Sequence, residues 1–216
     1  MSIARNARRL ARRTESLTRH PRPQAIGLAG WHLRVLRQCG AAPYDRAVAA
    51  AHEAGHAVVS LTLGGRPGPV TVSESQPGVW TGWTTFQWPP EQRSGEVHPL
   101  EHPWEARHAM VVAISGYAGE DAAGLAHPAS SPDEVFPVVA GCTAVAQHCG
   151  LEADVLVAGV LREAADRIGS NRKLFDAIRH ALEASDRVTA EQIDCLVRKH
   201  GLVSFPLESA WKAATP

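Results

Sequence analysis

The apolar positions along the chain predict a mainly helical protein with one small sheet, an α+β fold. The first predicted helix begins at Pro43, where Asp45 can support the first turn. Small residues and good helix formers fill this segment, and it ends at Gly64 and Gly65, where a left-handed cap forms easily.

Two short segments after this helix have the β-branched and aromatic residues that are typical of strands. They are residues 70–72 and 80–86, and a glycine-containing turn separates them. We therefore expect a small β-sheet next to the first helix. Trp80, Trp83 and Trp88 could line a substrate groove, but a sheet packed on helices needs such residues in its core, and we favour the core.

Four further helical segments make up the rest of the predicted domain. They span residues 104–123, 132–149, 152–184 and 189–200. The first of these is almost continuously apolar or small, so we expect it at the centre of the core. Pro137 interrupts the second, and a break near residues 169–171 divides the third. Residues 87–103 are polar and rich in proline, which predicts a loop.

Length and composition fit one compact domain with flanking tails. The chain has 216 residues, and 44% of them are hydrophobic, which is enough to build a core. We assign residues 43–203 to this domain, 1–42 to a basic arm with a short apolar segment, and 204–216 to a C-terminal tail. Residues 1–22 are rich in arginine, and Glu15 is their single acidic residue. We therefore expect the arm to be a solvated tail, a docking segment or a membrane-surface helix.

The net charge and the cysteine content exclude some classes of protein function. The net charge is zero, with 22 basic and 22 acidic side chains, so we predict no nucleic-acid partner. No stretch approaches the roughly 18 consecutive apolar residues of a transmembrane helix, and no secretory signal is visible, so we expect a cytoplasmic protein. The four cysteines lack CxxC spacing and predict neither a disulfide framework nor a cysteine-type zinc site; they are Cys39, Cys142, Cys149 and Cys195.

The chemistry is concentrated in the run His52-Glu53-Ala54-Gly55-His56, inside the first predicted helix. Residues four apart share a helix face, so both imidazoles can bind one metal ion while Glu53 projects beside them. This HExxH spacing is typical of a zinc metalloprotease helix that carries its own general base. The histidines without ligand spacing, which we expect to be structural or solvated, are His98, His102, His108, His127 and His148.

A catalytic zinc site needs a third protein ligand and an open position. The metzincin pattern is excluded, because Thr62 stands where its third histidine would lie, six residues after His56. Another histidine or a carboxylate placed by the fold could complete the site. The carboxylate candidates are the region of Glu120 and Asp121, and Asp133.

The run AHEAGHAVV at residues 51–59 resembles the peptidase signature of the FtsH family of ATP-dependent zinc proteases, in which HEAGH is the characteristic form. Residues 114–124 are similar to a glycine- and acid-containing helix of that family. Residues 130–133 (SSPD) fall where the family has Ser-Asn-Asp, whose Asp is the third zinc ligand. The resemblance covers about residues 44–200 and implies that Asp133 is the third ligand.

The resemblance implies a zinc metalloendopeptidase, a hydrolase that cuts flexible or unfolded polypeptides. Glu53 would take a proton from the attacking water, and Glu120 would either orient a ligating histidine or be a plain helix-edge acid. The strand at residues 78–86 is similar to one that binds extended peptides by edge pairing. The chain contains no GxxxxGK[ST] motif, so a separate ATPase or adaptor is a candidate partner. The alternative is a non-proteolytic binding or regulatory module with the same fold.

Overall fold

The computed structural model describes residues 44–88, 103–125 and 132–204, except for some side chains near the ends of α4 and α5. The elements, in chain order, are α3 (Arg46–Thr62), β1 (Arg66–Gln76), β2 (Val79–Gln87), α4 (Pro103–Ala122), α5 (Pro132–Cys149), α6 (Ala153–Ser170), α7 (Arg172–Ala184), β3 (Arg187–Val188) and α8 (Ala190–His200). The expected mainly helical α+β fold is confirmed. The predicted arm and nearly all of the predicted tail lie outside the described residues.

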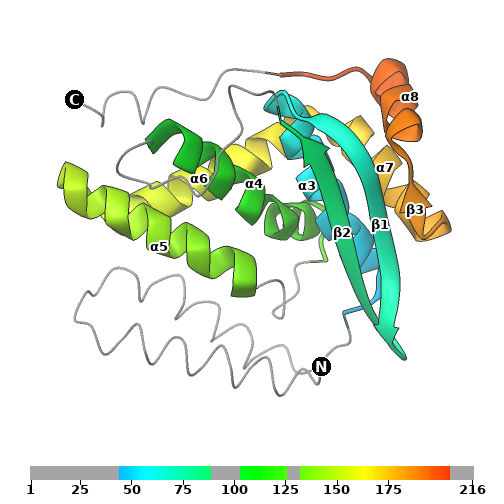
Figure 1. Cartoon of the computed structure of the whole chain (residues 1–216), viewed down its shortest axis with the longest axis horizontal. Helices are drawn as coiled ribbons and strands as arrows, with labels where there is room; N and C mark the ends of the chain where they lie inside the picture. Colours follow the sequence, from blue (N-terminus) through cyan, green and yellow to red (C-terminus); the bar gives the residue numbers. More distant parts are fainter. Residues whose placement is uncertain (1–43, 89–102, 126–131, 205–216) are drawn as a thin grey trace.

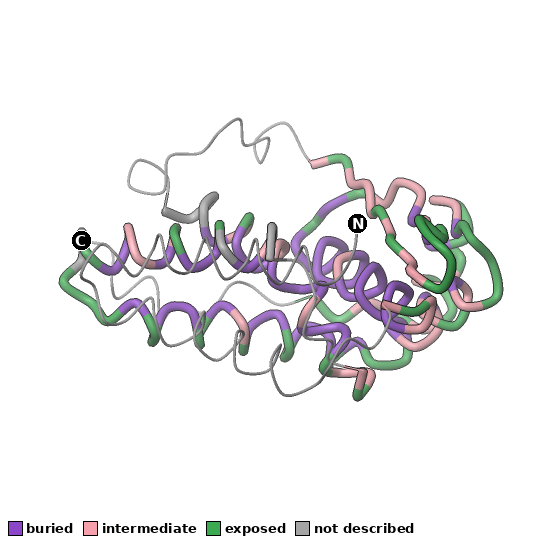
Figure 2. Tube along the Cα trace, turned by 90° about the horizontal axis from the view of Figure 1, so that it is seen from below, coloured by how far each residue is buried: buried purple, intermediate pink, exposed green. Residues whose placement is uncertain are grey.

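Helix α3 is the central element, and it contacts α4, α6, α7, β1 and β2. It begins at Arg46 rather than at Pro43, because Asp45 is the N-cap and its side chain accepts a hydrogen bond from the backbone N–H of Val48. It ends before Leu63, and Gly64 then takes a positive φ of 88°. Most of its residues are buried. Figure 2 shows buried residues gathered in the middle of the molecule and exposed ones along its outside.

The sheet is antiparallel and has the strand order β2-β1-β3. Strands β1 and β2 form a hairpin whose turn contains Gly78 at a φ of 73°. In the hairpin, Val70 lies opposite Thr84 and Val72 lies opposite Gly82. Strand β3 is only two residues long and was not expected, because so short a segment has no sequence pattern of its own. Figure 1 shows the hairpin crossing in front of α3, with α7, β3 and α8 beyond it.

Two glycines bring α3 and α4 unusually close together. A Cβ on Gly55 would lie 2.2 Å from the backbone oxygen of Ser115, and a Cβ on Gly119 would lie 2.4 Å from that of Ala51. Side chains at either position would force the helices apart. The glycine inside the HEAGH run therefore serves the helix crossing, and the crossing places the middle of α4 against His52.

Helix α6 packs against α3, α4 and α5, and α5 packs against α4 and α6. Helix α5 continues through Pro137, so the interruption expected there does not occur. Pro137 is exposed and lies in the second turn of the helix. Because proline has no backbone N–H, the helix loses one hydrogen bond there, but no donor is left buried without a partner. The expected break after residue 169 is confirmed, since α6 ends at Ser170 and α7 begins at Arg172.

A buried ionic group joins α4, α6 and the end of α3. The carboxylate of Glu163 accepts hydrogen bonds from the guanidinium groups of Arg107 and Arg167. Arg167 also donates to the hydroxyl of Thr62 at 3.2 Å, at the carboxyl end of α3. All of these residues are buried, so each charge depends on its partners.

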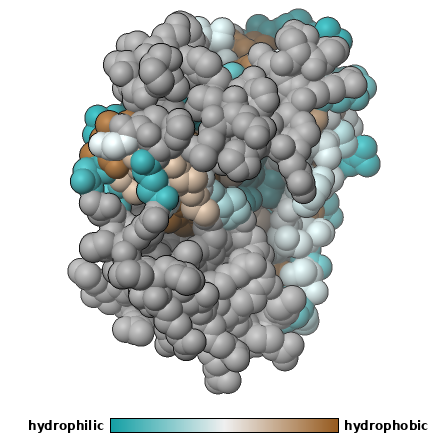
Figure 3. All heavy atoms as spheres, turned by 60° about the vertical axis from the view of Figure 1, so that its left-hand side comes forward, coloured by the Kyte–Doolittle hydropathy of each residue, from teal (hydrophilic) through white to brown (hydrophobic). Residues whose placement is uncertain are grey.

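No helix in the described ranges is long and apolar enough to cross a membrane. Where described residues are visible in Figure 3, hydrophilic and hydrophobic side chains are intermixed on the surface.

Candidate metal centre

His52 and His56 lie one turn apart on α3, and their Nε2 atoms are 3.0 Å from each other. The Nδ1 atom of His56 is 2.9 Å from the backbone oxygen of Val112, which can only accept, so this nitrogen carries the proton. The Nδ1 atom of His52 is 2.7 Å from a carboxylate oxygen of Glu120 and donates in the same way. Both Nε2 atoms therefore point their lone-pair positions toward one another, where a proton or a metal ion can bind.

Glu134, in the first turn of α5, adds a carboxylate to this pair. Its Oε1 atom is 3.1 Å from Nε2 of His56 and 3.3 Å from Nε2 of His52. Its Oε2 atom is buried and accepts no hydrogen bond from the described residues. One ligand atom from each of the three side chains lies within 4.8 Å of the others. Only a proton or a metal ion between these lone pairs would turn their repulsion into attraction, so this group could hold a metal ion.

The electrostatics of the group favour positive charge. Burial would lower the pKa of His52, but hydrogen bonds to Glu120 and Glu134 outweigh it and raise the pKa to about 10. Burial would raise the pKa of Glu134, but hydrogen bonds with His52 and His56 outweigh it and lower the pKa to about 2. The carboxylate of Glu134 thus remains ionised beside the two imidazoles, which is an environment suited to a cation.

Glu120 is fully buried on α4, and one of its carboxylate oxygens binds two side chains at once. Its Oε1 atom accepts from Nδ1 of His52 and, at 3.0 Å, from the hydroxyl of Tyr44. Burial, with the charge and hydrogen bond of Glu120, holds the pKa of Tyr44 well above its usual range. The absence of a side chain at Gly116 makes room for the ring of His52, since a Cβ there would lie 2.3 Å from Nε2. The structure thus fixes this ring from two sides.

The predicted third ligand, Asp133, lies in α5, but its side chain is outside the described residues. The carboxylate that the structure places beside both histidines is that of the next residue, Glu134. Sequence reasoning missed Glu134. Neighbouring residues on a helix point about 100° apart, so the acidic pair at 133–134 marked the right turn of the helix without showing which acid faces α3.

Glu53 faces a cavity beside this group. The side chain is 5% exposed, and its Oε2 atom accepts a hydrogen bond from the hydroxyl of Thr84 on β2. The cavity has a volume of about 240 Å³, and its walls are Glu53, His56, Ser60, Gly82, Trp83, Thr84, Phe86, Val112 and Glu134. The predicted base and two members of the metal-binding group therefore line one space.

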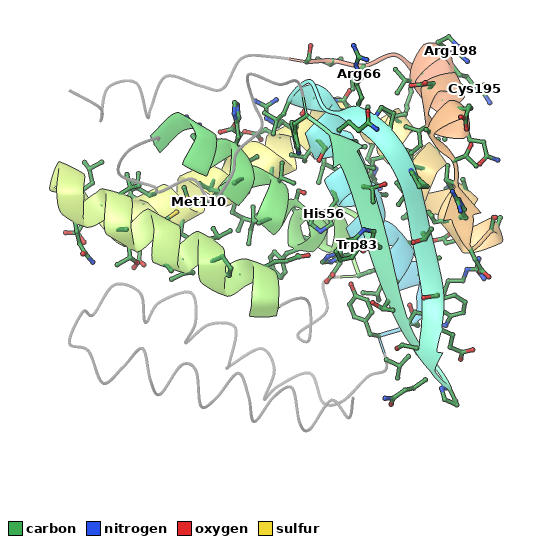
Figure 4. The ribbon with its side chains drawn as sticks, viewed as in Figure 1. His56, Arg66, Trp83, Met110, Cys195 and Arg198 are labelled. Atoms are coloured by element: carbon green, nitrogen blue, oxygen red, sulfur yellow. The ribbon has the colours of Figure 1, made fainter. Side chains whose placement is uncertain are left out.

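Trp83 stands at this cavity with 70% of its surface exposed, so the core position expected for it is wrong. Trp80 and Trp88 do pack against the core. Figure 4 shows Trp83 and His56 next to each other, between β2 and α4.

The remaining histidines do not join the group. His98, His102 and His127 lie outside the described residues, as does the side chain of His148. His108 lies in α4 and is not part of the metal-binding group found among the described side chains.

A comparison with protein-family models found no match for this chain, and a comparison with curated proteins found none either. The fold and the geometry of this site are therefore the observations that bear on its function.

Proposed function

We propose that this protein is a zinc-dependent metalloendopeptidase that hydrolyses peptide bonds in flexible or unfolded polypeptides. The supporting observation is the convergence of His52, His56 and Glu134 beside a cavity that Glu53 also lines. Two imidazoles and one carboxylate are a known ligand set for catalytic zinc, which keeps a further position open. Iron can use the same donors, but a carboxylate base next to the ligands favours hydrolysis.

Each side chain of this site would have a separate role in hydrolysis. Glu53 would accept a proton from the water that attacks the peptide carbonyl and deliver it to the leaving amine. Zinc, when bound, supplies a Lewis acid that lowers the pKa of water and polarises the carbonyl. Glu120 would hold His52 in the tautomer that leaves Nε2 free, and the carbonyl of Val112 would do the same for His56.

Strand β2 is the candidate site for the substrate backbone. It is an edge strand of the described sheet, and several of its residues line the cavity. An extended peptide could add to such an edge through backbone hydrogen bonds, which tolerate varied side chains. This mode of binding requires an unfolded segment. Action on folded proteins would therefore require a separate ATPase or adaptor.

The experiment is cleavage of a casein-like unfolded substrate, with the products identified by mass spectrometry. Wild-type protein loaded with zinc should cut internal peptide bonds, and a chelator should abolish cleavage until zinc is restored. Glu53→Gln should retain zinc and lose activity by roughly 10²-fold or more, because the proton acceptor is gone. Undiminished cleavage by Glu53→Gln would contradict the mechanism. Zinc binding without any cleavage in wild type would favour the binding-module alternative.

A further inference from the structure

We propose that Thr84 is the positioning residue for Glu53, so that the strand that lies along the cavity also holds the base in place. This inference rests on the proposed function. The Thr84 hydroxyl donates to Oε2 of Glu53 and also lies 3.3 Å from the backbone oxygen of that residue. In the described part of the chain, Thr84 is the hydrogen-bond donor to this carboxylate. No ion pair fixes Glu53 among the described residues, although the side chain is almost wholly buried.

Strand β2 is built to approach Glu53 closely. Residues 82 and 84 point to the same face of the strand, because side chains alternate along a strand. A Cβ on Gly82 would lie 2.3 Å from Cγ and 2.6 Å from Oε1 of Glu53, so only a glycine leaves room for the carboxylate. Gly82 and Thr84 thus act as a pair, in which one makes space for the side chain and the other binds one of its oxygens.

The position of Thr84 is itself well fixed. It lies opposite Val70 in the hairpin, and Val70 is fully buried in β1 and also pairs with Val188 of β3. A hydroxyl on this strand is therefore a rigid anchor for the carboxylate of Glu53. With Oε2 held, Oε1 is the oxygen left to exchange a proton in the cavity. A displacement of about 1 Å in a catalytic group can cost about 10²-fold in rate, so the anchor should affect turnover directly.

The kinetic test compares Thr84→Val with Thr84→Ser, since valine keeps the shape of threonine and serine keeps its hydroxyl. Thr84→Val should lower kcat by about 10- to 100-fold, with KM within about twofold of wild type, because the backbone of β2 is unchanged. Thr84→Ser should restore most of kcat, and zinc content should stay constant throughout. Thr143→Val, on α5, is the matched control: its hydroxyl donates to the backbone oxygen of Val139 at 2.7 Å within the helix, and kcat should not change.

A second measurement does not depend on activity. In metal-free protein, Thr84→Val should lower the unfolding midpoint in urea more in the presence of Glu53 than in a Glu53→Leu background, because only the former loses the hydrogen bond to the carboxylate. Equal shifts in both backgrounds, or an unchanged kcat in Thr84→Val, would overturn the positioning role. A wild-type protein that cleaves nothing would overturn the proposed function instead, and the stability comparison would still decide whether Thr84 holds Glu53.

Discussion

Replacing Gly116 with alanine should weaken metal binding, because this glycine lies directly against the ring of His52. The added Cβ would be 2.3 Å from both Cε1 and Nε2 of the ring. Nonbonded carbon atoms normally keep about 3.5–4.0 Å apart, so the ring or the helix must move by about 1 Å. The ring has little freedom, since Glu120 holds its Nδ1 atom at 2.7 Å. This movement would take Nε2 of His52 away from its place beside Nε2 of His56, where both atoms can bind one metal ion.

Two free-energy terms oppose each other in the metal-free protein. Alanine is favoured over glycine inside a helix by about 0.8–1.0 kcal/mol. Overpacking a closely fitted core costs about 1–3 kcal/mol. The free energy of unfolding should therefore fall by up to about 2 kcal/mol in Gly116→Ala. Zinc affinity should fall by about 10- to 100-fold, which is the loss typical of changes to the groups that orient metal ligands.

The assay is a zinc titration against a competing chelator, with urea denaturation of the metal-free protein beside it. Gly159→Ala is the matched control, because Gly159 is an exposed residue of α6 whose added Cβ would meet nothing within 4 Å. That variant should gain up to about 1 kcal/mol of stability and bind zinc as wild type does. Zinc affinity of Gly116→Ala within twofold of wild type would refute the close packing of this helix against the ligand.

Three further results follow from the same contacts. Glu120→Gln should bind zinc about 10- to 100-fold more weakly in a chelator titration, and unchanged affinity would remove its orienting role. Glu163→Ala should lose about 3–5 kcal/mol in urea denaturation, because it removes the carboxylate that two buried guanidinium groups bind. Asp176→Ala breaks only the more exposed ion pairs with Arg172 and Arg179 and should lose less than about 1 kcal/mol; equal losses would contradict this account. In metal-free protein, the raised pKa of His52 contributes stability that is complete below its ordinary pKa of 6.5 and is lost as the pH rises through about 10. The free energy of unfolding in urea should therefore fall over this pH range, and it should fall less in Glu134→Gln. An equal fall in both proteins would contradict the contact between His52 and Glu134.

Much of the fold could be predicted from the sequence, because its signals are local. The HExxH helix, its end at Gly64 and the break near Asn171 each depend on a few neighbouring residues. The continuity of α5 through Pro137 could not be predicted in the same way, although its bounds were. Pro137 is a strong local signal against a helix, but tertiary packing of the buried residues that follow it keeps the helix continuous.

The candidate site was less accessible to sequence reasoning, since it joins elements that are far apart in the chain. Glu134 approaches the histidines across 78 residues, and Thr84 approaches Glu53 across 31. Spacing on a helix can pair His52 with His56, but it says nothing about which side of another element faces them. The close approach of glycines at the α3–α4 crossing and at β2 decides these contacts, and it appears only in three dimensions.

The most direct test of the metal centre is the zinc content of wild-type, Glu134→Ala and Asp133→Ala proteins after dialysis against limiting zinc, measured by mass spectrometry of the metal. The site described above predicts about one zinc ion per chain in wild type and in Asp133→Ala, and near-complete loss in Glu134→Ala, because two histidines alone do not complete a structural or catalytic zinc site. Loss of zinc in Asp133→Ala with retention in Glu134→Ala would show that the other acid is the ligand. A wild-type protein that binds no metal would contradict the site altogether.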